Sequence, residues 1–247
     1  MKIVLVATAL FMQLILVSPT FGGEKLEDRA DYLADVQSYA ICTVRNYNKS
    51  ARDMILSNVD NKSMGRKFGD IYTEEALAFV PNCRELVLNY RSIIVEPDAL
   101  RASIAQVLVK KYFSDGAAAD FSDVTPLIHL QPENIEEYNE KIKAAKFEKQ
   151  RARIKKVYDE DVSRSWLSAF GECVVRFDTS NSRELVISKL GSPAELNAIS
   201  LIKPALSSCL VDGELLTLDK YTLRGTLAIN YYRLAMANGS ISKASSD

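Results

Sequence analysis

The sequence predicts an all-α protein in which two tandem, related helical modules, each closed by one disulfide, are joined by a long helix. Three observations support this fold class. Apolar residues recur near every 3.6 positions in two stretches, from Tyr32 to Val44 and from Trp166 to Phe177. The motifs around these stretches occur twice, and four cysteines divide evenly between the two copies. We therefore expect module 1 at residues 23–113, a linker and charged helix at 114–156, and module 2 at 157–247.

The first 22 residues have the pattern of a secretory signal peptide. Lys2 supplies a short basic start, and an almost unbroken apolar run extends from Ile3 to Val17. Small residues at Thr20 and Gly22 place the expected cleavage after Gly22. An uncleaved membrane anchor is the alternative, but this run is shorter than the roughly 20 residues that a bilayer requires. We expect a periplasmic or secreted protein with no transmembrane segment after cleavage.

One set of motifs occurs twice along the chain. Each copy places arginines 3 and 10 residues after its first cysteine: Ile-Cys-Thr-Val-Arg at 41–45 with Ala-Arg-Asp-Met-Ile-Leu-Ser at 51–57, and Glu-Cys-Val-Val-Arg at 172–176 with Ser-Arg-Glu-Leu-Val-Ile-Ser at 182–188. A closing segment, Leu-Arg-Ala-Ser-Ile-Ala at 100–105, corresponds to Leu-Arg-Gly-Thr-Leu-Ala at 223–228. We interpret the chain as two diverged copies of one module.

Four cysteines in an exported chain favour two disulfides, because the compartment is oxidising and the count is even. The sequence alone allows three connectivities, and four free thiols are a further alternative. A duplicated module carries its geometry with it, which favours pairing within each copy: Cys42 with Cys83 and Cys173 with Cys209. Each pair would close a loop of about 40 residues and contribute roughly 4 kcal/mol in the chain-entropy model.

Several helix ends can be placed from local signals. Ser192 to Glu195 is a capping box with proline at the first helical position, and it predicts a helix from 194 to 202. Pro97 with its neighbouring acid, and Asp219, begin the two closing helices, which we expect to end near Phe113 and Ala237. Two short apolar runs are compatible with strands and at most a minimal pairing: 93–95 and 215–218.

Between the copies, residues 114–132 contain glycine and two prolines and are typical of a linker. After it, residues 133–176 resemble one long helix. Its stretch from 141 to 156 is strongly basic, and acidic residues stand upstream, the favourable order for the helix dipole and for pairs four residues apart. A solvated helix face is the simplest interpretation. The alternative is a docking strip for anionic glycan or lipid headgroups.

Composition and motifs argue against a nucleic-acid, metal or cofactor protein. The chain has 31 basic and 32 acidic residues and a net charge of −1, so no polyanionic partner is implied. A single histidine cannot build a multi-histidine metal site, and disulfide-bonded cysteines leave no cysteine-rich one. No phosphate-binding glycine loop, dinucleotide fingerprint, haem-attachment motif or calcium loop is present. We expect no metal and no cofactor.

The one histidine, His129, lies in the linker between Pro126 and Pro132. As a catalytic base it would require a serine or cysteine nucleophile and an orienting acid brought to it by the fold. No nucleophile-elbow motif is present. We expect a packed or half-exposed loop histidine.

Six arginines recur at corresponding places near the cysteines: Arg45, Arg52, Arg101, Arg176, Arg183 and Arg224. Arginines at fixed places near a disulfide usually tie loops and helix ends together through carbonyls and carboxylates. We favour that structural interpretation. The alternative is an anion-binding cleft, since a guanidinium group binds carboxylate or phosphate through two parallel hydrogen bonds.

The acids at corresponding positions, Asp53 and Glu184, follow the repeated arginines. Their symmetry argues against catalysis, because an acid and base pair does not need a copy in each half. The sequence therefore favours a non-enzymatic periplasmic or secreted binding or envelope-associated protein. A carboxylate-dependent hydrolase acting on envelope glycans is the alternative. Another envelope protein or an anionic ligand is the partner class we expect.

The second copy also resembles a known group of sequences. The motif Cys-Val-Val-Arg at 173–176, the Gly-Ser-Pro-Ala-Glu motif at 191–195 and Leu-Arg-Gly at 223–225 occur together, as in uncharacterised exported proteins of alphaproteobacteria. The resemblance covers most of residues 163–236 and, more weakly, 32–113. It implies a bacterial origin and an exported location, and it implies no activity.

Overall fold

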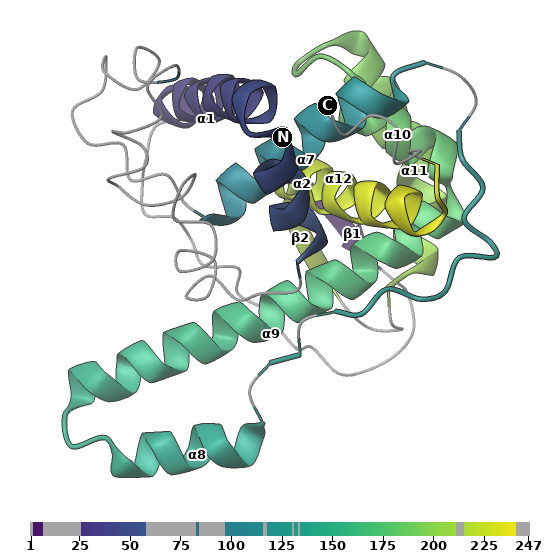
Figure 1. Cartoon of the computed structure of the whole chain (residues 1–247). Helices are drawn as coiled ribbons and strands as arrows, with labels where there is room; N and C mark the ends of the chain where they lie inside the picture. Colours follow the sequence, from purple (N-terminus) through teal and green to yellow (C-terminus); the bar gives the residue numbers. More distant parts are fainter. Residues whose placement is uncertain are drawn as a thin grey trace.

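A computed structural model describes residues 2–6, 26–57, 83, 97–115, 118–129, 131–132, 134–210 and 215–240. Within these residues the protein is all-α except for one two-stranded sheet, so the predicted fold class is confirmed. The helices gather into one body, and a helical hairpin projects from it (Figure 1).

In the two halves of the chain, a helix ends at a corresponding residue and a short helix follows it. In the first half, α1 (Leu26–Asn46) is followed by the nine-residue α2 (Asn48–Leu56). In the second half, α9 (Glu148–Phe177) is followed by the nine-residue α10 (Thr179–Ile187). A single residue separates the helices in each pair, Tyr47 in one and Asp178 in the other. These residues correspond in the sequence alignment of the two copies.

Three further helices, α11, α12 and α7, begin where the sequence predicts. In α11 (Pro193–Ser208), the Ser192 side chain accepts from the backbone N–H of Glu195 at 3.2 Å, while the Glu195 carboxylate accepts from the N–H of Gly191 at 2.8 Å. This helix runs beyond residue 202, with Pro204 inside it. Asp219 caps α12 (Lys220–Ala237), and α7 extends over Pro97–Phe113.

Both disulfides join cysteines of the same half. Cys42 on α1 pairs with Cys83, and Cys173 on α9 pairs with Cys209 at the C-terminal end of α11. The Cα atoms are 5.8 Å apart in each pair, a usual separation for a disulfide. The predicted pairing within each copy is confirmed, and no free cysteine remains among the residues that the structure describes.

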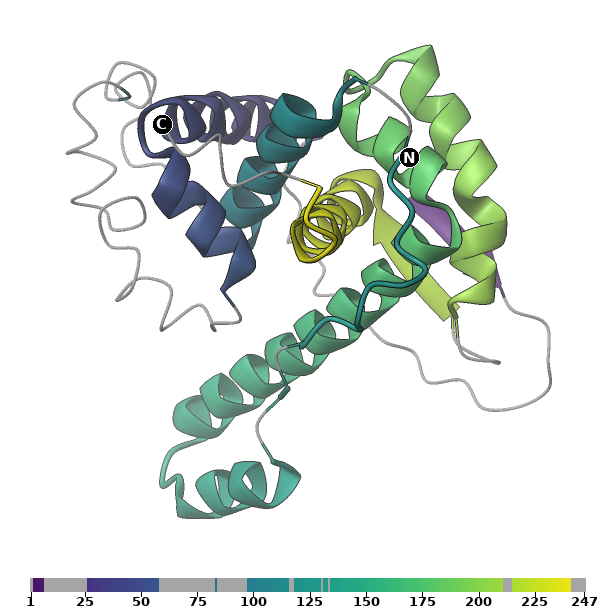
Figure 2. The ribbon, with the colours of Figure 1, turned by 45° about the vertical axis from the view of Figure 1, so that its right-hand side comes forward.

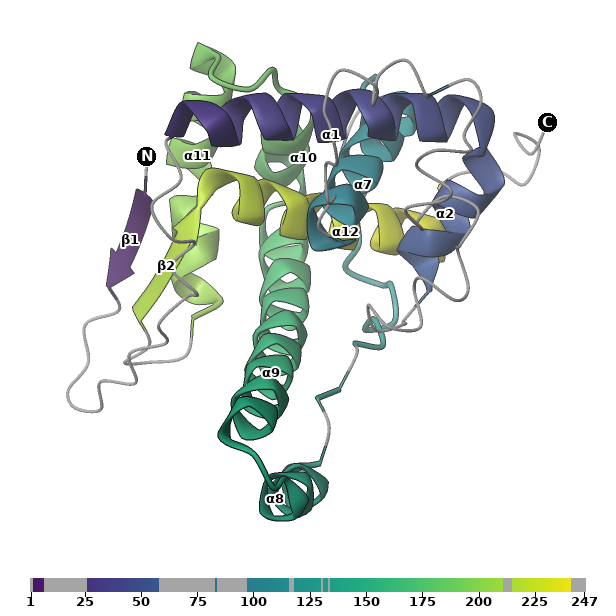
Figure 3. The same ribbon diagram turned by 90° about the vertical axis from the view of Figure 1, so that its left-hand side faces the viewer.

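One hydrophobic core is shared by the two halves. At its centre α7 crosses α12 (Figure 3). A Cβ atom added to Gly225 would lie 2.5 Å from the Cβ of Ala102. Glycine therefore lets the two helix backbones approach closely. These two residues occupy corresponding positions in the sequence alignment. The two halves pack against each other mainly through α7, which contacts α12 and α10, and α9 reaches α7 through an ion pair between Arg164 and Asp98 at 3.0 Å.

The helix expected over residues 133–176 is interrupted near its N-terminus. α8 (Ile135–Ala144) ends in a turn at residues 145–147, and the chain folds back into α9 (Figure 2). The rings of Tyr138 and Tyr158 stack across the hairpin with centroids 4.1 Å apart, and Ala145 is buried in the turn. A continuous helix would leave these aromatic rings in water, so packing overrides helix propensity here. We call residues 134–160 the arm.

The sheet pairs a strand at the N-terminus with the strand that directly precedes α12. β1 (Lys2–Val6) is antiparallel to β2 (Leu215–Asp219), with Lys2 opposite Asp219 and Val6 opposite Leu215 (Figure 3). β2 matches the short apolar run predicted at 215–218. β1 lies inside the segment expected to be a signal peptide, and the other predicted apolar run, 93–95, lies outside the described residues.

One core tyrosine makes the stability of the fold sensitive to alkaline pH. Tyr232 is fully buried, and burial raises the pKa of its hydroxyl to about 12, although the charge of Arg52 opposes this shift. An unfolded tyrosine ionises near pH 10. Above that pH the unfolded chain loses a proton that the folded chain keeps, so the free energy of unfolding falls between pH 10 and pH 12.

The free energy of unfolding should fall less steeply with pH in Tyr232→Phe. We expect the fall between pH 8 and pH 11 to be smaller by about 1 kcal/mol, since one pKa unit is equivalent to about 1.4 kcal/mol. Urea unfolding of both proteins at the two pH values measures it. The comparison at pH 8 is the control, because the hydroxyl is protonated there in both states. An equal alkaline loss in both proteins would show that Tyr232 does not cause it.

Candidate functional site

Arg101 and Arg224 donate hydrogen bonds to the C-terminal ends of short helices rather than lining an open cleft. Arg101 donates to the carbonyls of Ser57 at 2.8 Å and Ile55 at 3.5 Å, at the C-terminal end of α2. Arg224 donates to the carbonyls of Val186 at 2.6 Å and of the corresponding serine at the end of α10. Burial lowers the pKa of Arg101 to about 10, with a smaller contribution from the charge of Arg233.

Arg224 makes the larger set of contacts. It also donates to Glu195 at 3.2 Å and to Gln106 of α7 at 2.9 Å. Arg224 and Glu195 are both buried, and burial lowers the pKa of Arg224 although Glu195 opposes the shift. This arginine therefore joins α10, α11, α12 and α7, which is the structural role that the sequence favoured.

The other four candidate arginines have separate surroundings. Arg176 donates to the backbone carbonyl of Phe121, and Arg45 is exposed on α1. Arg52 lies near Tyr112, 5.9 Å from the ring centroid, and Arg183 is buried with Glu184 3.4 Å away. The two symmetric acids, Asp53 and Glu184, are exposed on α2 and α10.

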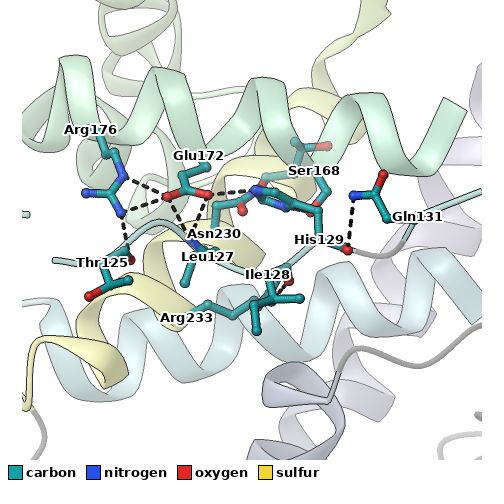
Figure 4. A network of polar contacts seen from close by, with 11 residues as sticks. Thr125, Leu127, Ile128, His129, Gln131, Ser168, Glu172, Arg176, Asn230 and Arg233 are labelled. Atoms are coloured by element: carbon teal, nitrogen blue, oxygen red, sulfur yellow. Dashed lines mark hydrogen bonds and ion pairs between the residues drawn. The ribbon is translucent and has the colours of Figure 1, made fainter. Parts of the chain in front are cut away.

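A polar network forms where residues 118–129, which we call the strap, lie along α9 (Figure 4). Its centre is the buried carboxylate of Glu172. One carboxylate oxygen accepts from Arg176 Nε at 2.7 Å and from the backbone N–H of Leu127 at 3.0 Å. Arg176 also donates to the strap carbonyls of Phe121 at 2.6 Å and Thr125 at 3.1 Å.

His129 occupies the other end of this network. Its Nε2 lies 2.6 Å from the second carboxylate oxygen of Glu172, and its Nδ1 lies 2.7 Å from Ser168 Oγ. The fold thus brings to His129 both a serine and an acid, the two groups that a catalytic histidine requires. The side chain is 14% exposed, which agrees with a packed loop histidine.

The opposite side of the strap is fixed to α12 and to the residue that follows it. Arg233 donates to the carbonyl of Ile128 at 2.5 Å, and Asn238 donates to the carbonyl of Asp120 at 3.2 Å. Burial lowers the pKa of Arg233, and the nearby charge of Glu172 opposes that shift. The strap is therefore held between α9 and α12, and His129 is held in place by its neighbours on both sides.

Sequence reasoning singled out His129 but missed Ser168 and Glu172. The available signal was the spacing of Ser168, Glu172 and Arg176, which stand four residues apart on one face of a helix. Nothing in the sequence shows that the strap folds back onto that face. Within the described part of the chain no cluster of acids, histidines and cysteines could hold a metal ion, and no helix is long and apolar enough to cross a membrane.

The arm is a second candidate surface, and it carries the whole basic stretch from 141 to 156. Four of its cations have an acidic neighbour on the same helix: Lys141, Arg151, Lys155 and Lys156. Lys143, Lys146 and Lys149 are exposed near the turn and have no acidic partner among the residues that the structure describes. Phe147, between them, is 71% exposed. We call these three lysines and Phe147 the tip.

In comparisons with known proteins, no family model, curated protein or solved structure matches the chain.

Proposed function

We propose that this chain is an exported, envelope-associated binding protein whose helical arm attaches it to an anionic membrane surface. The observation that supports this function best is the tip. An exposed aromatic side chain stands among three lysines without acidic partners, at the end of a hairpin that projects from the body (Figure 2).

Charge supports an anionic partner. Between residues 141 and 156 the chain has eight basic residues and one acidic residue, although the whole chain is close to neutral. Lysines near an anionic membrane surface contribute about 1 kcal/mol each to binding. The stretch from 141 to 156 therefore favours a negatively charged surface, while the rest of the chain gives no such preference.

Phe147 distinguishes a lipid surface from an anionic glycan. A ring that is 71% exposed gains free energy when it enters an apolar medium, and the acyl region of a bilayer provides one. An anionic polysaccharide offers charges but little apolar surface. The combination of phenylalanine and lysines therefore supports a phospholipid headgroup layer as the partner.

Export is supported by the leader-like residues 1–22 and by the two disulfides, which persist in oxidising compartments. Cleavage after Gly22 would remove β1, so β2 would lose its strand partner in the mature protein. The resemblance to exported alphaproteobacterial proteins supports the same location.

A duplicated module explains the symmetry of the body. Arg101 binds Ile55 and Ser57, and Arg224 binds the residues that correspond to them in the second copy. The contact of Ala102 with Gly225 joins corresponding positions, as expected for two copies related by an approximate two-fold axis. Among the residues that the structure describes, the first copy has no hairpin like the arm, which supports a function that belongs to the arm itself.

Cosedimentation of the disulfide-bonded mature protein with lipid vesicles tests this function. We expect binding to vesicles that contain phosphatidylglycerol and little binding to phosphatidylcholine alone. Replacing the three tip lysines, as Lys143→Gln, Lys146→Gln and Lys149→Gln together, should weaken binding by about 100-fold, since each contributes about 1 kcal/mol. High salt should weaken the wild type in the same direction.

A matched control removes three exposed lysines from the body: Lys49→Gln, Lys189→Gln and Lys203→Gln. This variant has the same net charge as the tip variant and should bind like the wild type. Equal weakening in both variants, or equal binding of the wild type to neutral vesicles, would contradict the proposal. Retention on an anionic polysaccharide without vesicle binding would assign the arm to glycans instead.

A further inference from the structure

We propose that Ser168, His129 and Glu172 form a serine-type hydrolytic centre for small carboxylic esters. The centre lies on α9 about 30 Å from the tip of the arm, given a rise of 1.5 Å per residue. It uses none of the tip residues, so it is independent of membrane attachment.

The distances meet the requirements of an activated nucleophile. The serine oxygen is 2.7 Å from one nitrogen of the imidazole ring, and the carboxylate oxygen is 2.6 Å from the other (Figure 4). A nucleophile, a base and an orienting acid within hydrogen-bond reach of one another are the groups that acyl transfer requires. Here Nδ1 faces the serine and Nε2 faces the acid.

The environment of Glu172 assigns the proton on the ring. Its carboxylate accepts hydrogen bonds from Arg176 and from the N–H of Leu127, and so it is held as an acceptor toward His129. The ring N–H therefore lies on Nε2, and Nδ1 is free to accept the proton of Ser168. Glu172 acts as a positioning residue, while Ser168 and His129 would contact the substrate.

Glu172 is more deeply buried than the histidine and the serine that it supports. The side chain of Glu172 is 8% exposed, that of His129 is 14% exposed, and Ser168 is half-buried. A buried acid keeps its hydrogen bonds strong because little water competes for them. A serine that is only half-buried suits a nucleophile that must meet a substrate. The strap contacts of Arg176 and Arg233 hold the ring in this position.

The reaction requires no further reactant except water. Ser168 Oγ bonds to the ester carbonyl carbon as its proton passes to His129 Nδ1. The tetrahedral adduct then collapses, the bond to the alcohol oxygen breaks, and the alcohol leaves with the proton from Nδ1. Water attacks the acyl-serine and gives a proton to Nδ1, and that proton returns to Ser168 as the carboxylic acid is released.

A fluorophosphonate probe tests the centre directly, because an activated serine displaces its fluoride and keeps the phosphonyl group. We expect intact-mass and peptide analysis of the disulfide-bonded protein to place one adduct on Ser168, together with slow hydrolysis of p-nitrophenyl acetate. Ser168→Ala should abolish the adduct, and His129→Gln should slow labelling by at least about 100-fold. Glu172→Gln should also slow labelling, and Glu172→Asp should restore part of the rate.

Ser165→Ala is the matched control, because this serine lies one turn away on the same helix and outside the network. It should label like the wild type. Thermal unfolding of each variant separates loss of reactivity from loss of fold, and Ser168→Ala is the smallest change. A folded wild-type protein without an adduct on Ser168, or one labelled equally fast after His129→Gln, would overturn the proposal and leave the network a structural strap contact.

Discussion

Replacement of Arg224 by methionine is expected to lower the free energy of unfolding by about 3–5 kcal/mol. The substitution keeps the volume of the side chain but removes the charge and every donor. Glu195 is 1% exposed and would lose its closest cationic partner at 3.2 Å, keeping only the more distant Lys220 at 3.6 Å. A buried carboxylate without its partner is one of the most destabilising defects in a protein interior.

Arg224→Met would also remove hydrogen bonds to the backbone of α10. The carbonyls of Val186 and Ser188 at its C-terminal end accept from Arg224, and the Ser188 hydroxyl lies 3.2 Å from the same guanidinium group. Unsatisfied buried carbonyls add to the cost. Arg101→Met should act in the same direction with a smaller effect, because Arg101 has no buried acid of this kind beside it.

Urea unfolding of the oxidised protein measures this prediction. Arg45→Met is the control, since this arginine is exposed and the change should stay within about 0.5 kcal/mol. Adding Glu195→Gln to Arg224→Met should recover part of the loss, because it removes a buried charge that has lost its closest partner. An Arg224→Met protein as stable as the wild type would show that the buried pair does not support the fold.

Removal of the second disulfide is expected to have a comparable effect. Cys173→Ala with Cys209→Ala should lower the free energy of unfolding by about 4 kcal/mol, from the entropy of closing a loop with a sequence separation of 36. The disulfide connects α9 to the C-terminal end of α11. Its removal gives more conformational freedom to the unfolded chain than to the folded chain. Thermal unfolding should shift by about 10 °C.

Ser207→Ala with Ser208→Ala provides the control for this pair, because both serines are exposed beside Cys209. Non-reducing peptide mapping of the control should still recover Cys173 joined to Cys209. A doubly substituted protein that unfolds at the temperature of the wild type would show that this disulfide adds nothing to stability.

The body of the fold could be predicted because its signals are local. The capping box at Ser192, the cap at Asp219 and the proline at 97 set helix starts, and these held in the structure. The disulfide pairing followed from the repeat. The arm could not be predicted, because its turn at 145–147 contains neither glycine nor proline and depends on stacking of Tyr138 with Tyr158.

The candidate site was only partly visible in the sequence. His129 stood out as a single histidine, but its partners Ser168 and Glu172 lie about 40 residues away in the chain. Such a contact depends on how the strap packs, and no local pattern encodes it. The arginines were easier to interpret, since carbonyls at the ends of helices are common partners for guanidinium groups.

The central proposal is that the tip of the arm enters an anionic membrane surface, and a single tryptophan at the tip tests it most directly. The chain contains one tryptophan, Trp166, so Phe147→Trp combined with Trp166→Phe places the only indole at the tip. With phosphatidylglycerol vesicles we predict a shift of its emission to shorter wavelength and quenching by brominated acyl chains, and neither change with phosphatidylcholine. Emission that stays at the wavelength of a water-exposed indole in the presence of anionic vesicles would contradict the proposal.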